Sequence, residues 1–334
     1  MSSLSTVYWM NFRRFLLAIT LFVALPFPAL AGAEEATSDK SAPAGESHID
    51  DHKKHHGLPK PAPILYHGIG GNPETGKVGP LAITNSMVVM LVVAACIILV
   101  AQLATRKAAL IPSGLQNFVE WLVESLYGFF EGVLGAHMVK KTFWFFATIF
   151  IFILFSNWFG LIPGLGTIGW AEQGHHNEHV TNPLLRGVNA DLNMTLAMAA
   201  IFMVLWLFWC IREIGPGGFV GHIFDVKGHG SGFFGIFLVA VFICVGVIEV
   251  VSICVRPVAL TFRLYGNVFA GENMLESVMM MGNQLVPYIG GAIAVLPFYL
   301  LEILVGLVQA LVFALLTSVF TALMCEHHEE EHSH

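Results

Sequence analysis

Six charged residues stand inside the two longest apolar stretches of this 334-residue chain, where a membrane-spanning helix normally carries none. They are Glu249, Arg256, Arg263, Glu272, Glu276 and Glu302. A charge near the centre of a bilayer costs several kcal/mol, so such side chains are normally paired or face water. Carboxyl groups exchange protons, whereas arginine keeps its charge. These six residues therefore need partners or contact with water inside the membrane.

Helical geometry places four polar groups of the first stretch on one narrow stripe. At about 100° per residue, Arg256 lies about 20° from the direction of Arg263, and Glu249 lies about 40° from it. Asn267 lies about 40° to the other side, whereas Glu272 points about 180° away from Arg263. One face of this helix therefore carries the cations, and the opposite face carries carboxylates further along.

Two interpretations of the stripe are open. Glu249 and Arg256 can simply neutralise each other within the helix, because seven residues bring them to the same face. Arg263 has no acidic residue three or four positions away, so this explanation does not extend to it. Its counter-charge is then a carboxylate on another molecule, and a second membrane protein is the natural supplier. In the next apolar stretch, Glu302 and Gln309 are also seven residues apart and share a face.

The composition identifies the class of protein that must position these residues. Hydrophobic residues make up 56% of the chain, charged residues only 12%, and the mean hydropathy is +0.72. Soluble domains carry about 25% charged residues, so this chain lacks the polar surface of one. The apolar runs are long and do not alternate, which predicts an all-α integral membrane protein. No basic patch suggests a nucleic-acid partner, and the five cysteines have no paired spacing, so we expect small buried hydrophobic residues there.

We expect about five membrane-embedded helices and one amphipathic helix at the membrane interface or against a partner. Spans are predicted at residues 83–104, 142–162 and 193–210, the amphipathic helix at 115–133, and a Gly- and Pro-rich connection at 215–232. The last two helices, 233–284 and 288–324, would reach about 75 Å and about 55 Å, whereas the hydrocarbon core is about 30 Å thick. They must therefore be tilted, kinked or broken, and we expect a tilted hairpin that turns near residues 286–287.

The ends of the chain have a different composition. Residues 1–31 have the pattern of a signal peptide or leader, with two arginines before an apolar run and small residues at its end. Residues 32–80 are polar and His-rich, so we expect a poorly ordered extracytoplasmic segment before a membrane domain at 81–324. The cations Arg106 and Lys107 after the first span predict a cytoplasmic side there. This orientation gives a cytoplasmic tail at 325–334 and a multi-pass protein of the bacterial inner membrane.

Two patterns outside the spans imitate ligand sites. Residues 71–77 have the spacing of a phosphate-binding loop, but Val78 stands where a hydroxyl for Mg²⁺ is needed and no strand precedes it. Histidines gather at His48, His52, His55, His56, His175, His176, His179, His327, His328, His332 and His334. They lie on tails and a loop without a complete set of fixed geometry, so we expect no cofactor or structural metal.

Four stretches resemble the subunit a family of F-type ATP synthases. The most specific is Leu-Thr-Phe-Arg-Leu-Tyr-Gly-Asn-Val-Phe-Ala-Gly-Glu at residues 260–272, which contains Arg263. The others are Phe-Ser-Asn-Trp-Phe-Gly-Leu-Ile-Pro-Gly at 155–164, Asn-Ala-Asp-Leu-Asn-Met-Thr-Leu at 189–196, and Gln-Ala-Leu-Val-Phe at 309–313. The resemblance covers about residues 80–324 in the right order, and the number of spans agrees with it.

The resemblance implies a role for each polar residue. Arg263 corresponds to the family's essential arginine, which faces the carboxylates of the rotating c-ring. The ion path open to the outside would include Glu272, Glu302, Gln309, Asn267, Asp191, Asn193 and Asn157. Glu249, with Arg256 close by, falls near the path to the cytoplasm. Many relatives place a histidine and an acid where this chain has Glu272 and Glu302, which leaves open which group relays the proton and whether H⁺ or Na⁺ is carried.

The resemblance also implies partners. These are the c-ring, the b subunits of the peripheral stalk and the F1 head, together with membrane lipid, and the chain would have no catalytic site of its own. Two alternatives stay open from the residues alone. One is a secondary transporter or ion channel that uses Arg263, Glu272 and Glu302, although no internal repeat supports it. The other is a membrane scaffold, which does not explain the polar stripe.

Overall fold

The computed structural model describes residues 64–66, 83–106, 109, 111–165, 168–170, 182–183, 185–224, 233–287 and 289–326. The predicted leader, the phosphate-loop-like residues 71–77, every histidine named above and most of segments 32–80 and 325–334 lie outside the described residues.

The described chain is built from long helices. They are α2 (Asn85–Thr105), α3 (Leu115–Gly160), α4 (Leu192–Phe224), α5 (Phe233–Leu285) and α6 (Gly290–Glu326), with a short 3₁₀ helix η4 (Val188–Ala190) before α4. Two small antiparallel pairs join β1 (Ile64–Tyr66) to β2 (Ile83–Thr84) and β3 (Gly169–Trp170) to β4 (Asn182–Pro183). In the described ranges, five helices are long and apolar enough to cross a membrane. The prediction of an all-α membrane protein with about five embedded helices is confirmed.

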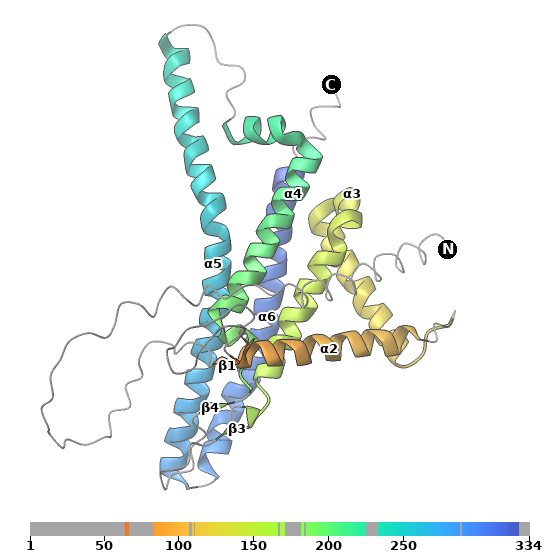
Figure 1. The fold of residues 1–334 in the computed structure, drawn as a ribbon, viewed down its shortest axis with the longest axis vertical. Coiled ribbons are helices and arrows are strands. Elements are labelled where there is room, and N and C mark those ends of the chain that lie inside the picture. Colours follow the sequence, from red (N-terminus) through yellow and green to blue (C-terminus); the bar gives the residue numbers. More distant parts are fainter. Residues whose placement is uncertain are drawn as a thin grey trace, which may run out of the picture.

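Helix α3 contains the predicted amphipathic helix and the predicted second span as two segments. The helical path is interrupted at Gly135, whose backbone has φ 74° and ψ 160°. A side chain at this φ is strained, so glycine is the residue that permits the break. Figure 1 shows α3 turning back on itself at its upper end. The second segment, after Gly135, carries most of the buried aromatic residues of the helix.

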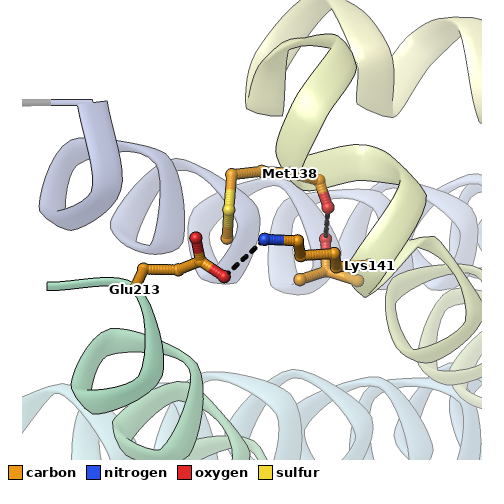
Figure 2. Close-up of polar contacts among 4 residues, drawn as sticks. Met138, Lys141 and Glu213 are labelled. Atoms are coloured by element: carbon orange, nitrogen blue, oxygen red, sulfur yellow. Dashed lines mark hydrogen bonds and ion pairs between the residues drawn. The ribbon is translucent and has the colours of Figure 1, made fainter. Parts of the chain in front are cut away.

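Helix α4 bends in the same way at Gly215, which has φ 78° and ψ 158°. The Gly- and Pro-rich connection predicted at 215–232 is helical in its first part, because residues up to Phe224 belong to α4. Pro216 is compatible with helix there because it stands in the first turn after the break, where a missing N–H costs nothing. Beside the break, Lys141 Nζ pairs with Glu213 Oε1 at 2.7 Å, next to Met138, and joins α3 to α4 (Figure 2).

Helices α5 and α6 form the predicted hairpin and lie side by side along the long axis of the molecule (Figure 1). Pro257 and Pro297 lie inside these helices without ending them. At the turn, Gly282 and Gly290 are in backbone contact, and the Gly291 N–H donates to Asn283 Oδ1 at 3.0 Å. Figure 1 shows α2 crossing the direction of this hairpin steeply, so α2 and the hairpin cannot both stand upright in a membrane.

The hydrophobic core lies among α2, α3, α4 and α6. Its largest fully buried side chains include Phe146, Phe202 and Trp206. In contrast, one face of α5 is bare and apolar: Ile248 is 67% exposed and Phe262 is 59% exposed. Apolar surface of this length is buried in lipid or against another membrane protein. The hairpin therefore has an inner side packed on α3 and α4 and an outer side left for a neighbour.

Candidate functional site

Five of the predicted site residues line one pocket between helices. They are Asn157 from α3, Asn267 and Glu272 from α5, and Glu302 and Gln309 from α6. The remaining wall comes from Ser156, Gly160, Leu161, Gly187, Asn189, Val268, Val305 and Gly306. The carboxylates therefore meet on the inner side of the hairpin, where α5 and α6 pack on α3 and on the segment before α4.

Amide side chains hold the walls of the pocket together. Asn189 Nδ2 donates to Asn157 Oδ1 at 2.7 Å, and Asn157 Nδ2 donates to the Gly306 carbonyl at 3.0 Å. Across the hairpin, Asn267 Nδ2 donates to Gln309 Oε1 at 2.6 Å. Asn267, one of the four polar groups of the predicted stripe, therefore faces α6. The bonds fix the register of α3, α5 and α6 around the pocket.

Three buried polar atoms of the pocket wall have no hydrogen-bond partner among the residues that the structure describes. They are Ser156 Oγ, Asn189 Oδ1 and Gln309 Nε2. A buried polar group without a hydrogen bond costs about 1–3 kcal/mol, so such groups are normally bonded to protein or to ordered water. Three of them around one cavity, beside two carboxyl groups, provide the partners that water molecules need. The pocket is therefore suited to hold water next to the acids.

Glycines bring both acids against the neighbouring backbone. A Cβ on Gly271 would overlap the carboxylate of Glu302, and a Cβ on Gly187 would lie 3.1 Å from Glu272 Oε1. Each carboxylate thus occupies space that a side chain would fill. The predicted pair of acids comes together, Glu302 from α6 and Glu272 from α5.

Arg186 is a charged neighbour of this site that sequence reasoning did not select. It precedes Gly187, and its charge acts on Glu272 together with the charges of Glu302 and Glu276. In the sequence it is the one Lys or Arg between the second and third predicted spans, and this was the available signal. The positive charge offsets part of the repulsion among the acids.

Arg263 lies outside the pocket, on the exposed side of α5. Within the described ranges, no carboxylate forms an ion pair with it. The same helix thus presents a cation on its outer surface and an acid on its inner one. An exposed arginine in an apolar helix face calls for a counter-charge, and the bare face around Phe262 leaves room for a neighbouring protein to supply it.

Glu249 and Arg256 form an ion pair within α5, with Nη2 and Oε1 3.0 Å apart. The predicted shared face is confirmed, and so is the interpretation that these charges are paired with each other. Arg256 also stacks on Phe320 of α6, with its guanidinium carbon 4.4 Å from the ring centroid. The cation is therefore held by α6, whereas Glu249 is 41% exposed. The acid remains accessible at the edge of the helix.

Asp191 and Asn193 do not line the pocket. Asp191 is buried, and its Oδ1 accepts from the Asn193 N–H at 3.0 Å, which caps the start of α4. Its Oδ2 accepts from the Ser86 hydroxyl of α2 at 2.6 Å. The side chain of Asn193 is exposed. Within the described ranges, no group of three or more His, Cys, Asp or Glu side chains is arranged to hold a metal ion.

Comparison with known families explains this combination of helices and charges. The family model described as "ATP synthase A chain" matches residues 87–322, which include every site residue discussed above except Ser86. The chain belongs to the ATP synthase A chain family. The family predicted from the motif around Arg263 is therefore confirmed, and the matched span begins in α2 and ends in α6.

The curated relatives of this chain, which share its ATP synthase A chain family, are named ATP synthase subunit a. A relative from Gloeobacter violaceus is 29% identical over 78% of this chain and 92% of its own length. One from Protochlamydia amoebophila is 30% identical over 74% of this chain and 82% of its own length. In one from Anaeromyxobacter dehalogenans, 31% identity extends over 77% of this chain but 62% of the relative.

Proposed function

We propose that this chain is the stator ion-channel subunit of the Fo sector of ATP synthase. It provides two offset half-paths through which protons reach and leave the carboxylates of a c-ring. The observation that carries the proposal is the division of α5. Among the described residues Arg263 has no ion-pair partner on the outer side, whereas Glu272 lies in a polar pocket on the inner side. A fixed cation and a separate acidic compartment are the two parts that such a channel needs.

Arg263 would act on the partner carboxylate. A c-ring carboxyl group that faces lipid is protonated, because a bare charge in hydrocarbon is costly. Beside the guanidinium the ionised form is favoured, so the group releases its proton there. Arginine keeps its charge throughout, which also blocks a direct proton leak between the half-paths. Ions then cross only when the ring turns.

The outer half-path would run through the pocket. Glu272 and Glu302 lie close enough to influence each other electrostatically, and their amide neighbours Asn157, Asn267 and Gln309 shape the surrounding wall. The unpartnered polar atoms of this wall support a water-filled access route. Asp191 and Asn193 would lie on the approach to the pocket rather than in it.

The inner half-path would pass Glu249. Its partner Arg256 is anchored on Phe320, so the carboxylate rather than the cation is the movable member of the pair. During synthesis, a proton released beside Arg263 would leave past Glu249 toward the cytoplasm. A membrane potential of 100 mV supplies about 2.3 kcal/mol of free energy for each proton that crosses. Several protons are therefore needed for each ATP.

The chain is a membrane subunit of the ATP synthase complex and not its catalytic subunit. Within this complex, we propose contacts with the c-ring at the Arg263 face, with the b subunits of the peripheral stalk, and with the F1 head through the complex. A cytoplasmic C-terminus and a bacterial inner membrane are supported by the cations Arg106, Lys107 and Arg212 at the ends of the first and third predicted spans. We retain the proposal of a leader at 1–31 and an extracytoplasmic segment at 32–80.

The test is ATP-driven acidification of inverted membrane vesicles that contain the complete complex. Wild type and Arg263→Ala are compared at matched amounts of assembled ATPase. We expect Arg263→Ala to abolish pumping while ATP hydrolysis by the bound head remains measurable. Undiminished pumping would reject the channel role and favour the alternative of a secondary transporter, which also predicts that no c-ring or ATPase head co-purifies with the chain.

A further inference from the structure

A chain of three hydrogen-bonded side chains leads from the edge of the molecule to a buried carboxylate. Thr84, just before α2, is partly exposed, whereas Ser86 is 0% exposed and Asp191 is 5% exposed. Thr84 Oγ1 and Ser86 Oγ are 2.9 Å apart, and Ser86 Oγ donates to Asp191 Oδ2 at 2.6 Å. The three groups therefore connect the surface beside β2 with the start of α4.

The hydrogen bonds of this chain have a defined direction. A serine hydroxyl carries one proton, and that of Ser86 points to Asp191. Thr84 must then be the donor in its bond with Ser86. Thr84 Oγ1 accepts from the Met87 N–H at 3.4 Å and keeps a second lone pair for a donor from outside. Both hydroxyl protons thus point inward, toward the carboxylate.

The inner end of the chain adjoins the acidic pocket. Asp191 directly follows η4, and Asn189 of η4 lines the pocket with its unpartnered Oδ1. The charges of Asp191 and Glu272 both act on Tyr265 of α5, as does that of Arg186. Asp191 and the pocket-lining Asn189 are only two residues apart along this segment, so the hydroxyl chain ends close to the wall of the pocket.

We propose that Thr84 and Ser86 form a hydroxyl relay that delivers protons from the outer surface to Asp191, at the outermost part of the ion path. The inference rests on the proposed function. A hydronium ion of the outer water gives its proton to Thr84 Oγ1, and the original Thr84 proton moves to Ser86 Oγ. The original Ser86 proton moves to Asp191 Oδ2, and rotation of the hydroxyl groups resets the chain. Pumping driven by ATP uses the same steps in reverse.

A purely structural role for these contacts makes a different prediction. Asp191 also caps α4, and asparagine caps helices as well as aspartate does. An asparagine at 191 can bond both the Asn193 N–H and the Ser86 hydroxyl, but it cannot carry a proton at neutral pH. Asp191→Asn therefore separates the relay from the scaffold. Thr84→Val and Thr84→Ser form a second pair, because valine preserves shape and serine preserves the hydroxyl.

The experiment measures ATP-driven acidification of inverted vesicles per assembled complex, in H₂O and in D₂O. We expect Ser86→Ala, Asp191→Asn and Thr84→Val to slow pumping severalfold and to increase the solvent isotope effect, with Thr84→Ser near wild type. Ser318→Ala is the control, because Ser318 is equally buried but donates within α6, to the Leu315 carbonyl at 2.8 Å. It should pump normally.

Wild-type pumping in Ser86→Ala and Asp191→Asn would overturn the relay. So would a loss confined to the amount of assembled complex, with an unchanged rate per complex, because that result shows a structural contact. Arg263→Ala is measured in parallel. If it pumps normally, the proposed function fails; if it alone abolishes pumping while the relay variants do not slow it, only the relay fails.

Discussion

The carboxylate of Glu302, on α6, lies against the backbone of α5 at Gly271, the residue immediately before Glu272. A Cβ at position 271 would overlap both carboxylate oxygens and the carboxyl carbon. The two acids therefore share one level of the hairpin because this position has no side chain. A contact of this kind couples the backbone of one helix to the chemistry of the other.

Gly271→Ala should displace the Glu302 carboxylate without removing any ionisable group. The clash is with the end of a flexible side chain, so the helix can remain in place while the acid moves. We expect pumping to fall by about tenfold, since small displacements of a reacting group are costly. The measurement is vesicle acidification per assembled complex. The double variant Gly271→Ala/Glu302→Asp, whose shorter side chain avoids the clash, should recover part of the rate.

The control for this prediction is Gly221→Ala, where the added methyl group meets no atom within 4 Å. It should pump like wild type. Equal rates for Gly271→Ala and Gly221→Ala would show that the position of the Glu302 carboxylate does not matter for transport.

Glu302→Gln removes the ionisable group but keeps the size and the shape of the side chain. If Glu302 relays protons in the pocket, pumping should fall by about 10²-fold, the usual lower range for loss of a positioned acid–base group. Glu276→Gln is a matched comparison, because Glu276 is exposed and does not line the pocket. Normal pumping rates in Glu302→Gln would refute the relay role.

Arg263→Lys keeps a positive charge but changes its shape and its ability to deprotonate. A lysine next to hydrocarbon can lose its proton, whereas arginine cannot. We therefore expect Arg263→Lys to lose coupled pumping as completely as Arg263→Ala does. Arg106→Lys serves as the control, because Arg106 is exposed just after α2 and lies outside the pocket. Coupled transport at the wild-type rate in Arg263→Lys would contradict the requirement for a permanent charge.

Sequence reasoning predicted relations within one helix better than contacts between helices. Helical periodicity predicted that Glu249 and Arg256 share a face, because that relation lies within one helix. The contact between Gly271 and Glu302 depends on the register of two helices, which no periodicity contains. Sequence reasoning did not select Arg186, because no periodicity relates a loop residue to the acids of two helices. Its position beside the acids depends on how the segment before α4 folds.

The helical end of α4 was missed for a different reason. Gly and Pro residues after position 214 have the composition of a loop, and composition alone does not distinguish a loop from a helix with one sharp bend. Here a single glycine with positive φ makes the turn, and the helix resumes directly after it. The same device at Gly135 separates the two parts of α3, where the change from amphipathic to apolar character made the boundary visible.

Gly215→Ala should therefore destabilise the protein. A non-glycine residue with φ near 78° and ψ near 158° costs about 1–3 kcal/mol, since this region is essentially open to glycine alone. The free energy of unfolding in mixed micelles measures the change. Gly217→Ala is the control, because it stands two residues further along, meets no atom within 4 Å and has no positive φ. In a helix, alanine there should be neutral or stabilising by up to about 1 kcal/mol. Equal stabilities of the two variants would mean that the bend at Gly215 is not required for the fold.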